Sequence, residues 1–92
     1  IISFRDIDTE KVWQRISSPK FSPDLQRMAQ RRLVLLDAAE VLQDLRIPPG
    51  NRLEALKGDR AGQHSIRVND QWRICFVWTP NGPEKVELVD YH

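Results

Sequence analysis

The spacing of apolar residues changes near Leu53, and this change constrains the fold more than any other feature of the chain. Before it, apolar residues recur every three or four positions, as on one face of a helix; beyond it, apolar and polar residues alternate, as in half-buried strands. Helices followed by hairpin-linked strands predict an α+β fold, with the helices on one face of a small antiparallel sheet. The 92 residues suffice for one such domain, spanning residues 1–92.

The first half of the chain predicts a short strand followed by two or three helices. Residues 1–4 are mostly apolar and are followed by a charged pair, after which Asp8 is the predicted cap of a helix that ends before the next proline. The clearest helix begins with Ser22 as its cap and Pro23 in its first turn, and its basic residues lie mostly opposite its apolar face. A further short turn of helix is expected over residues 42–45.

The second half predicts antiparallel strands over residues 63–68, 72–78 and 85–89, with a short further strand over residues 53–56. Turn-forming residues separate the three longer strands. In the middle strand the large apolar residues share one face, so this strand is expected to lie inside the sheet. The sheet face away from the helices is expected to be concave and partly open, and Arg73 lies on it.

Charge and cysteine usage narrow the classes of function. The formal net charge is only +1, but ten arginines against four lysines favour contacts with phosphate. Cys75 is the single cysteine, which excludes an internal disulfide and favours a reducing cytoplasm. One cysteine and two histidines do not give the spacing of a zinc site, so no metal or other cofactor is expected. Neither a signal peptide nor a membrane span is expected, because no apolar stretch is long enough.

The last three residues, Asp90, Tyr91 and His92, form one group of candidate functional residues. They follow directly on a predicted strand, so a carboxylate, a phenol and an imidazole would leave the sheet at a fixed place. An imidazole titrates near neutrality and can carry a proton. This combination indicates acid/base chemistry.

A second group combines a strand with a turn. Ser65, Arg67 and Arg73 are polar residues expected on the open sheet face, and Arg73 lies in the most apolar strand, where an unpaired charge would be costly. The turn over residues 56–62 holds two cations and one carboxylate beside glycines, whose backbone amides can approach an anion closely. This turn lacks the spacing of a phosphate-binding loop, so it is a candidate anion site only in combination with Arg73 and the last three residues of the chain.

Several segments resemble one known protein family: Leu53-Glu54-Ala55-Leu56-Lys57-Gly58-Asp59-Arg60, Gly62-Gln63, Ile66-Arg67-Val68-Asn69, Gln71-Trp72-Arg73-Ile74 and Asp90-Tyr91-His92. With them the chain resembles the HigB family, the host-inhibition toxins of type II toxin–antitoxin systems within the RelE/ParE superfamily. The resemblance implies a RelE-like fold and a metal-free endoribonuclease that cuts messenger RNA in the A site of the 70S ribosome. It also implies a HigA-type helix-turn-helix antitoxin, through which the pair would bind operator DNA.

The resemblance also implies catalytic residues, which fall on Lys57, Arg73, Asp90, Tyr91 and His92, and Glu54 is a further catalytic candidate beside them. The basic face of the long helix makes Arg27 and Arg31 candidates for ribosome binding, and Arg60 and Arg67 are further candidates for RNA binding. Glu54 departs from the pattern, since several members have a histidine at that position. A carboxylate there can act as a base or orient Lys57, but it cannot replace an imidazolium acid.

The expected reaction is attack of a ribose 2′-hydroxyl on the adjacent phosphate. Asp90 or Glu54 would accept the 2′ proton and His92 would protonate the 5′ oxygen, or the two roles would be exchanged. Lys57 and Arg73 would stabilise the charge on the phosphorane oxygens, while the phenol of the tail would orient or stack on a base.

Two alternatives stay open at this point. A gyrase-inhibiting toxin of the ParE type would share the fold but would not need a cluster of proton-transfer groups. A non-catalytic binding module would use the tail and the Lys57 turn only to recognise a protein or RNA partner.

Overall fold

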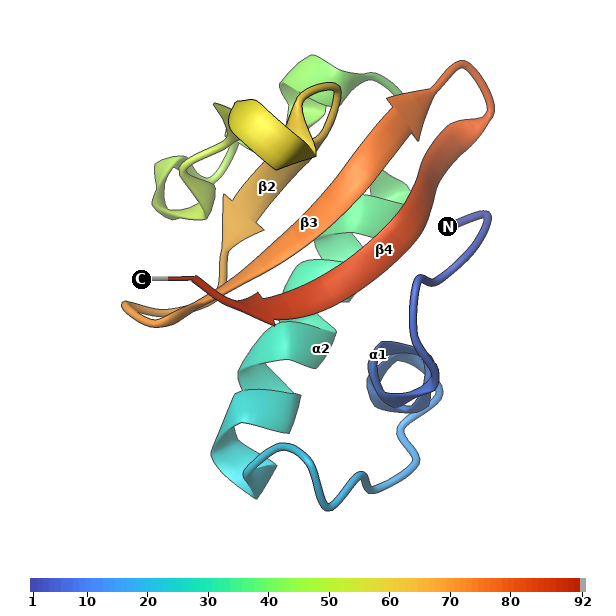
Figure 1. The fold of residues 1–92 in the computed structure, drawn as a ribbon, viewed down its shortest axis with the longest axis vertical. Coiled ribbons are helices and arrows are strands. Elements are labelled where there is room, and N and C mark those ends of the chain that lie inside the picture. The colour runs from blue at the N-terminus through green and yellow to red at the C-terminus, as the bar shows by residue number, and fades with distance from the viewer. Residues whose placement is uncertain (92) are drawn as a thin grey trace.

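The computed structural model describes residues 1–91, in which two α-helices pack on one face of a four-stranded antiparallel sheet (Figure 1). The elements are α1 (Ile7–Trp13), α2 (Pro23–Ala38), β1 (Glu54–Ala55), β2 (His64–Arg67), β3 (Trp72–Thr79) and β4 (Gly82–Asp90), with 3-10 turns η1 (Leu42–Arg46), η2 (Pro49–Asn51) and η3 (Gly58–Arg60). The strand order is β1-β2-β3-β4. The expected α+β, RelE-like arrangement is therefore confirmed.

The long helix α2 forms where its local signals predict it. The Ser22 hydroxyl accepts a hydrogen bond from the Leu25 amide at 3.2 Å, and Pro23 occupies the first turn, where its missing N–H leaves no helical bond unmade. Ala29, Leu33 and Leu36 recur at helical spacing and are fully buried or nearly so. This apolar stripe fixes α2 against the sheet.

The first helix begins two residues earlier than predicted, so the assignment of Asp8 as its cap was wrong. Asp6 has extended backbone angles and its side chain accepts a hydrogen bond from the Thr9 amide at 2.8 Å, which makes it the cap. Asp8 instead accepts a hydrogen bond from the Ser18 hydroxyl at 2.9 Å and ties α1 to the following loop. The helix ends at Trp13, well before the proline.

The predicted first strand is shorter than expected. Residues 1–5 run parallel to the outer edge of β4, where the Ile2 amide donates to the Pro83 carbonyl and the Arg5 amide to the Val86 carbonyl. Only Phe4 and Val86 form a bridge. The charged pair that follows Phe4 leads directly into the cap of α1, so no regular strand develops.

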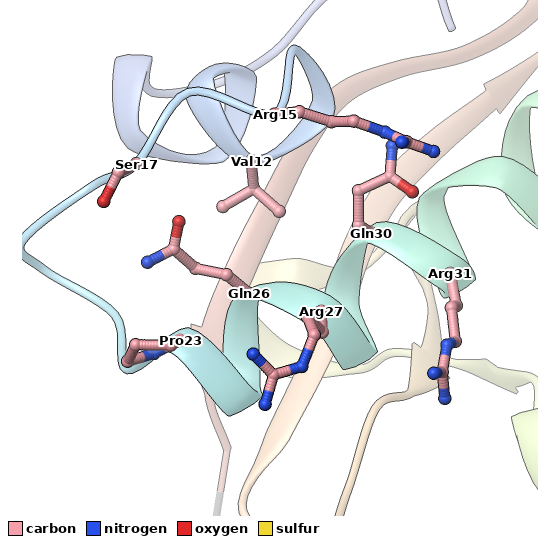
Figure 2. Close-up of a pocket in the computed structure, with 8 residues that line it drawn as sticks. All are labelled: Val12, Arg15, Ser17, Pro23, Gln26, Arg27, Gln30 and Arg31. Carbon is pink, nitrogen blue, oxygen red and sulfur yellow. The ribbon is translucent and has the colours of Figure 1, made fainter.

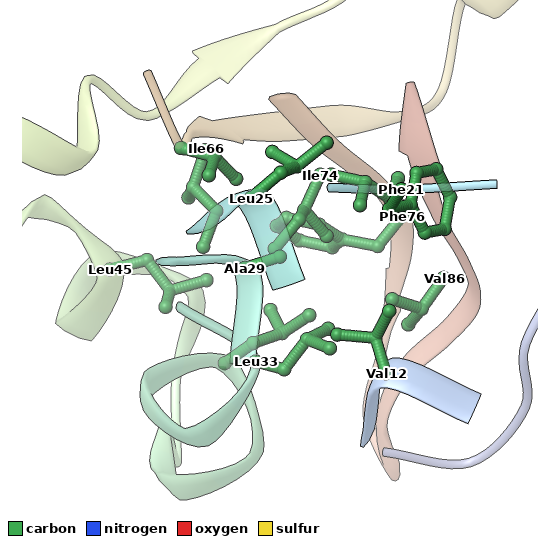
Figure 3. Packing of buried hydrophobic residues seen from close by; sticks show 13 residues of the cluster. Val12, Phe21, Leu25, Ala29, Leu33, Leu45, Ile66, Ile74, Phe76 and Val86 are labelled. Carbon is green, nitrogen blue, oxygen red and sulfur yellow. The ribbon is translucent and has the colours of Figure 1, made fainter. Parts of the chain in front are cut away.

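The core lies between α2 and the sheet, as Figure 3 shows for Leu25, Ala29 and Leu33 facing the strands. On the sheet side it is formed by alternate residues of β3, among them Ile74 and Phe76, which are fully buried. β3 lies between β2 and β4, so the prediction that it is interior is confirmed. None of the helices within residues 1–91 is long and apolar enough to cross a membrane.

Candidate functional site

Strand register decides which side chains occupy the face of the sheet that α2 leaves uncovered. Residues paired directly across neighbouring strands point to the same face. Two cross-strand rows occupy this face: Glu54, Ser65, Cys75 and Glu87 form one, and Arg67, Arg73 and Val89 form the other. The uncovered face is therefore far more polar than the core face.

Arg73 lies in the middle of this face with only 8% of its surface exposed. Its Nε donates a hydrogen bond to the Ser65 hydroxyl at 2.7 Å, and its Nη2 donates to the backbone carbonyls of Arg52 and Ser65. These bonds hold the guanidinium in one orientation. Within residues 1–91 its Nη1 has no hydrogen-bond partner. The protein thus fixes a cation and leaves one of its donors unused.

A pocket of about 300 Å³ lies over this guanidinium. Its lining residues are Arg52, Glu54, Arg67, Asn69, Asp70, Arg73 and Tyr91, and we call it the open-face pocket. The Tyr91 side chain reaches it because the Tyr91 amide donates to the Gln71 carbonyl at 2.7 Å and holds the end of β4 beside the β2–β3 turn. The structure therefore brings four of the candidate residues together: Glu54, Arg67, Arg73 and Tyr91.

Carboxylates share the open-face pocket with its cations. Glu54 Oε2 lies 4.0 Å from Arg73 Nη2, and the Glu54 side chain is 55% exposed. Arg67 forms an ion pair with Asp70 across the β2–β3 turn. The rim of the pocket can thus accept protons while its floor carries positive charge, which is the combination that phosphoryl chemistry needs.

Asp90 does not line the open-face pocket. It pairs with Trp72, whose ring packs on the helix side against Phe21, with the ring centroids 5.6 Å apart. The register therefore directs Asp90 away from the face that carries Arg73. Its Oδ2 accepts a hydrogen bond from Gln71 Nε2 at 2.9 Å.

Lys57 is exposed and precedes η3, outside the lining of the open-face pocket. Its side chain has no hydrogen bond or ion pair with any other residue that the structure describes. His92, the remaining candidate, lies outside the described residues. Of the six catalytic candidates, three line the open-face pocket: Glu54, Arg73 and Tyr91.

The turn that follows Lys57 lies on the uncovered side of the sheet, where Figure 1 shows η3 in yellow in front of one end of β2. Arg60 Nη1 donates to Gln63 Oε1 at 3.1 Å and to Glu87 Oε2 at 3.3 Å. Arg5 Nε lies 3.5 Å from the same Glu87 oxygen. Arg60 is thus used within the protein, as an ion pair that joins η3 to β4.

Cys75 lies on this same face and is fully buried. Burial raises the pKa of the Cys75 thiol above its ordinary value, and the nearby Arg60 guanidinium opposes that rise. The thiol is therefore held in its neutral form at physiological pH, and it behaves as a small buried side chain rather than a nucleophile.

Arg27 and Arg31 lie on the other side of the molecule, on α2. They line a groove of about 470 Å³ between the two helices, which we call the helix groove. Figure 2 shows Val12 and Gln26 pointing into the space between α1 and α2. Arg27 forms an ion pair with Asp24 one turn earlier in α2. These arginines are well separated from the open-face pocket by the sheet and the core.

Arg52 and Asp70 line the open-face pocket but were not among the candidates from the sequence. Arg52 has a left-handed backbone (φ 45°, ψ 58°), an unusual conformation for a residue other than glycine. The break at Pro48-Pro49 indicates a turn there but gives no sign of which residue takes this conformation. Among residues 1–91 no three histidine, cysteine or acidic side chains are grouped so as to hold a metal ion.

Comparison with known proteins identifies the family. Residues 2–92 match the family of RelE-like toxins of the type II toxin–antitoxin system HigB. The toxin HigB-1 of Vibrio cholerae serotype O1 is 41% identical over 78 residues, which cover 84% of this chain and 82% of that protein. An uncharacterized protein of Haemophilus influenzae is 37% identical over 62 residues, or 67% of this chain and 61% of that protein. The chain therefore belongs to the HigB-like toxin family of type II toxin–antitoxin systems, a membership that implies an antitoxin partner.

Proposed function

We propose that this toxin is a ribosome-dependent, metal-free endoribonuclease that cleaves messenger RNA in the ribosomal A site. The observation that carries the proposal is the Arg73 guanidinium, fixed by Ser65 and by the Arg52 carbonyl at the floor of a pocket that Glu54 and Tyr91 also line. A preorganised cation with an unused donor is suited to stabilising the negative charge that develops on a phosphorane.

In the proposed reaction the ribose 2′ oxygen forms a bond to phosphorus and the bond between phosphorus and the 5′ oxygen breaks. A carboxylate, Glu54 or Asp90, accepts the 2′ proton, and His92 donates a proton to the leaving 5′ oxygen, or the two roles are exchanged. The products are a cyclic phosphate and a free 5′-hydroxyl. Glu54 is favoured as the carboxylate by its position beside Arg73, at 4.0 Å.

Three residues have supporting roles in this proposal. Tyr91 lines the pocket with 41% of its surface exposed, which suits a phenol that orients or stacks on a base. Lys57 would add positive charge, and Arg67 would contact RNA in competition with its partner Asp70. The family resemblance supports Lys57 and Asp90, although neither side chain lines the open-face pocket.

The proposed activity requires the ribosome because the open-face pocket is small and has few groups that can recognise a base. Holding the messenger in a cleavable geometry must then come from another surface, since positioning supplies much of the rate in such a reaction. We propose that Arg27 and Arg31 in the helix groove contact ribosomal RNA. The partner would be a HigA-type helix-turn-helix antitoxin that also carries the pair to operator DNA, and the site of action would be the cytoplasm.

The test is cleavage of a messenger bound in the A site of purified ribosomes, read by primer extension. We expect Arg73→Gln to lower the cleavage rate by about 10²- to 10³-fold, and Arg73→Lys to recover only part of it because an ammonium lacks the planar fork. Arg32→Gln on α2 is the matched control for loss of one charge. Cleavage by Arg73→Gln at the unmodified rate, in protein that is shown to be folded, would refute the catalytic role.

The gyrase alternative is tested in the same cells. Induction of a ParE-type toxin would produce DNA breaks and leave messengers intact, whereas the proposed nuclease would produce the reverse. Deletion of Tyr91 and His92 tests the catalytic assignment itself: growth inhibition and messenger cleavage that persist undiminished without these residues would refute it.

A further inference from the structure

A second pocket, of about 410 Å³, lies at the β1 edge of the sheet. Its lining residues are Leu42, Gln43, Arg46, Pro49, Arg52, Leu53, Ala55 and His64, and we call it the edge pocket. Its walls come from η1, η2 and the ends of β1 and β2. Its volume falls within the range of roughly 300–1,000 Å³ that is typical of small-ligand sites.

The edge pocket combines cations with apolar surface. The guanidinium groups of Arg46 and Arg52 form no ion pair or hydrogen bond with any other residue among 1–91, in contrast to Arg60 and Arg67. Leu42, Leu53 and Pro49 supply apolar contacts beside them, and no carboxylate from residues 1–91 lines the edge pocket. Uncompensated cations next to apolar surface match a ligand with an anionic part and a flat, weakly polar part, as a nucleotide has.

His64 adds hydrogen-bonding capacity to the edge pocket. Its ring stacks on Phe76, with the centroids 6.3 Å apart and the planes 25° from parallel, so its orientation is fixed. Its Nδ1 is buried and has no hydrogen-bond partner within the part of the chain that the structure describes. Because Nδ1 is buried, the imidazole meets the edge pocket through the rest of its ring, whose Nε2 also forms no hydrogen bond within residues 1–91.

Arg52 connects the edge pocket to the open-face pocket, because its side chain lines both. Its left-handed backbone also directs its carbonyl to Arg73 Nη2. One residue thus lines both pockets and also provides its carbonyl as an acceptor to the guanidinium of the open-face pocket. An RNA strand that occupies both pockets must pass Arg52.

We propose that the edge pocket is a second nucleotide subsite, which binds a nucleotide of the same RNA strand that the open-face pocket holds. Arg46 and Arg52 contact its phosphates, and the apolar wall and His64 contact its base. This inference rests on the proposed function, since it supposes that RNA occupies the open-face pocket. The edge pocket then contributes to substrate affinity without taking part in bond cleavage.

The experiment is a titration of the full chain, in isotopically labelled form, with 2′-O-methyl hexauridylate, an RNA analogue that lacks the attacking hydroxyl. Nuclear magnetic resonance follows two sets of side-chain signals: Arg73 and Tyr91 in the open-face pocket, and Arg46 and His64 in the edge pocket. The His64→Gln variant assigns the His64 signal. We expect both sets to shift together, with the same saturation curve.

Shifts at Arg73 and Tyr91 without shifts at Arg46 and His64 would overturn the second subsite and leave the proposed function standing. Shifts at neither set would contradict both. Inorganic phosphate and hexaglutamate are tested as probes in parallel. If either moves the Arg46 and His64 signals as far as the oligonucleotide does at equal charge concentration, the edge pocket is a general anion site or a protein-docking site, and the proposal is wrong.

A pair of charge variants measures the contribution of the edge pocket. Arg46→Gln should weaken binding of the oligonucleotide by roughly 10- to 100-fold, the loss expected for one charge-assisted hydrogen bond. Arg32→Gln removes the same charge from α2, outside both pockets, and should change binding less than twofold. Equal losses of affinity in the two variants would mean that only long-range electrostatic attraction contributes to binding, and would contradict a specific contact at Arg46.

Discussion

Ser65→Ala is the sharpest test of how Arg73 is held. The Ser65 hydroxyl is fully buried and accepts the Arg73 Nε hydrogen bond at 2.7 Å, while the guanidinium itself is only 8% exposed. Removing the hydroxyl leaves a charged N–H with no partner in a place that water reaches poorly. Because hydrogen bonds to charged groups contribute about 1.5–3 kcal/mol, we expect the free energy of unfolding to fall by about 2 kcal/mol.

Urea denaturation followed by tryptophan fluorescence measures this loss. A change of about 2 kcal/mol corresponds to a drop in melting temperature of roughly 8–16 °C for a domain of this size. Ser17→Ala, at an exposed serine, is the matched control and should alter stability by less than about 0.5 kcal/mol. Cleavage on the ribosome should also weaken, because the guanidinium of the variant is no longer held in one orientation.

A double-mutant cycle decides whether the loss comes from this hydrogen bond. In the Arg73→Met background the Ser65 hydroxyl has lost its charged donor, so Ser65→Ala should there cost less than about 0.5 kcal/mol. If Ser65→Ala costs the same in both backgrounds, the serine stabilises the sheet for some other reason, and the account of a preorganised cation is wrong.

Three further predictions follow from other parts of the structure. Glu87→Gln weakens the ion pair that joins Arg60 of η3 to β4, so amide hydrogen exchange over residues 58–62 should become faster while the melting temperature changes by only a few degrees; unchanged exchange would contradict the bridging role. Burial raises the pKa of the Cys75 thiol, so the native state retains a proton that the unfolded chain releases; stability relative to Cys75→Ala should fall as pH rises above about 9, and a difference that is constant with pH would contradict this. Changing Arg27 and Arg31 together to Glu should weaken ribosome binding at least tenfold, as measured by cosedimentation, with no loss of oligonucleotide binding; intact ribosome binding would exclude the helix groove as the contact.

Local signals predicted the helices well, but they did not choose between competing caps. Ser22 and Pro23 fix the start of α2 because no neighbouring residue offers an equal cap. Asp6 and Asp8 both have the chemistry of a cap, and which of them is used depends on where residues 1–5 pair with β4, a contact between distant parts of the chain. Such long-range pairing cannot be read from one local pattern.

The candidate site was predictable in part, and strand alternation explains the difference. Alternation within β3 predicts that Arg73 lies opposite the core residues, and the register confirms it. The same alternation in β4 directs Asp90 and Tyr91 to opposite sides of the sheet, although their adjacency in the sequence suggested a single cluster. Arg52 was missed because its contribution comes from a backbone conformation that its residue type does not favour.

The Arg60–Glu87 ion pair, which spans from η3 to β4, restricts where a long ligand can lie on the uncovered face. Arg60 and Glu87 close one half of the uncovered face, above Cys75, and leave the half beside the β2–β3 turn accessible. The Arg60–Glu87 ion pair thus acts as a stop at one end of the open face, and a long ligand that lies over Arg73 extends away from it, toward the β2–β3 turn and the end of β4.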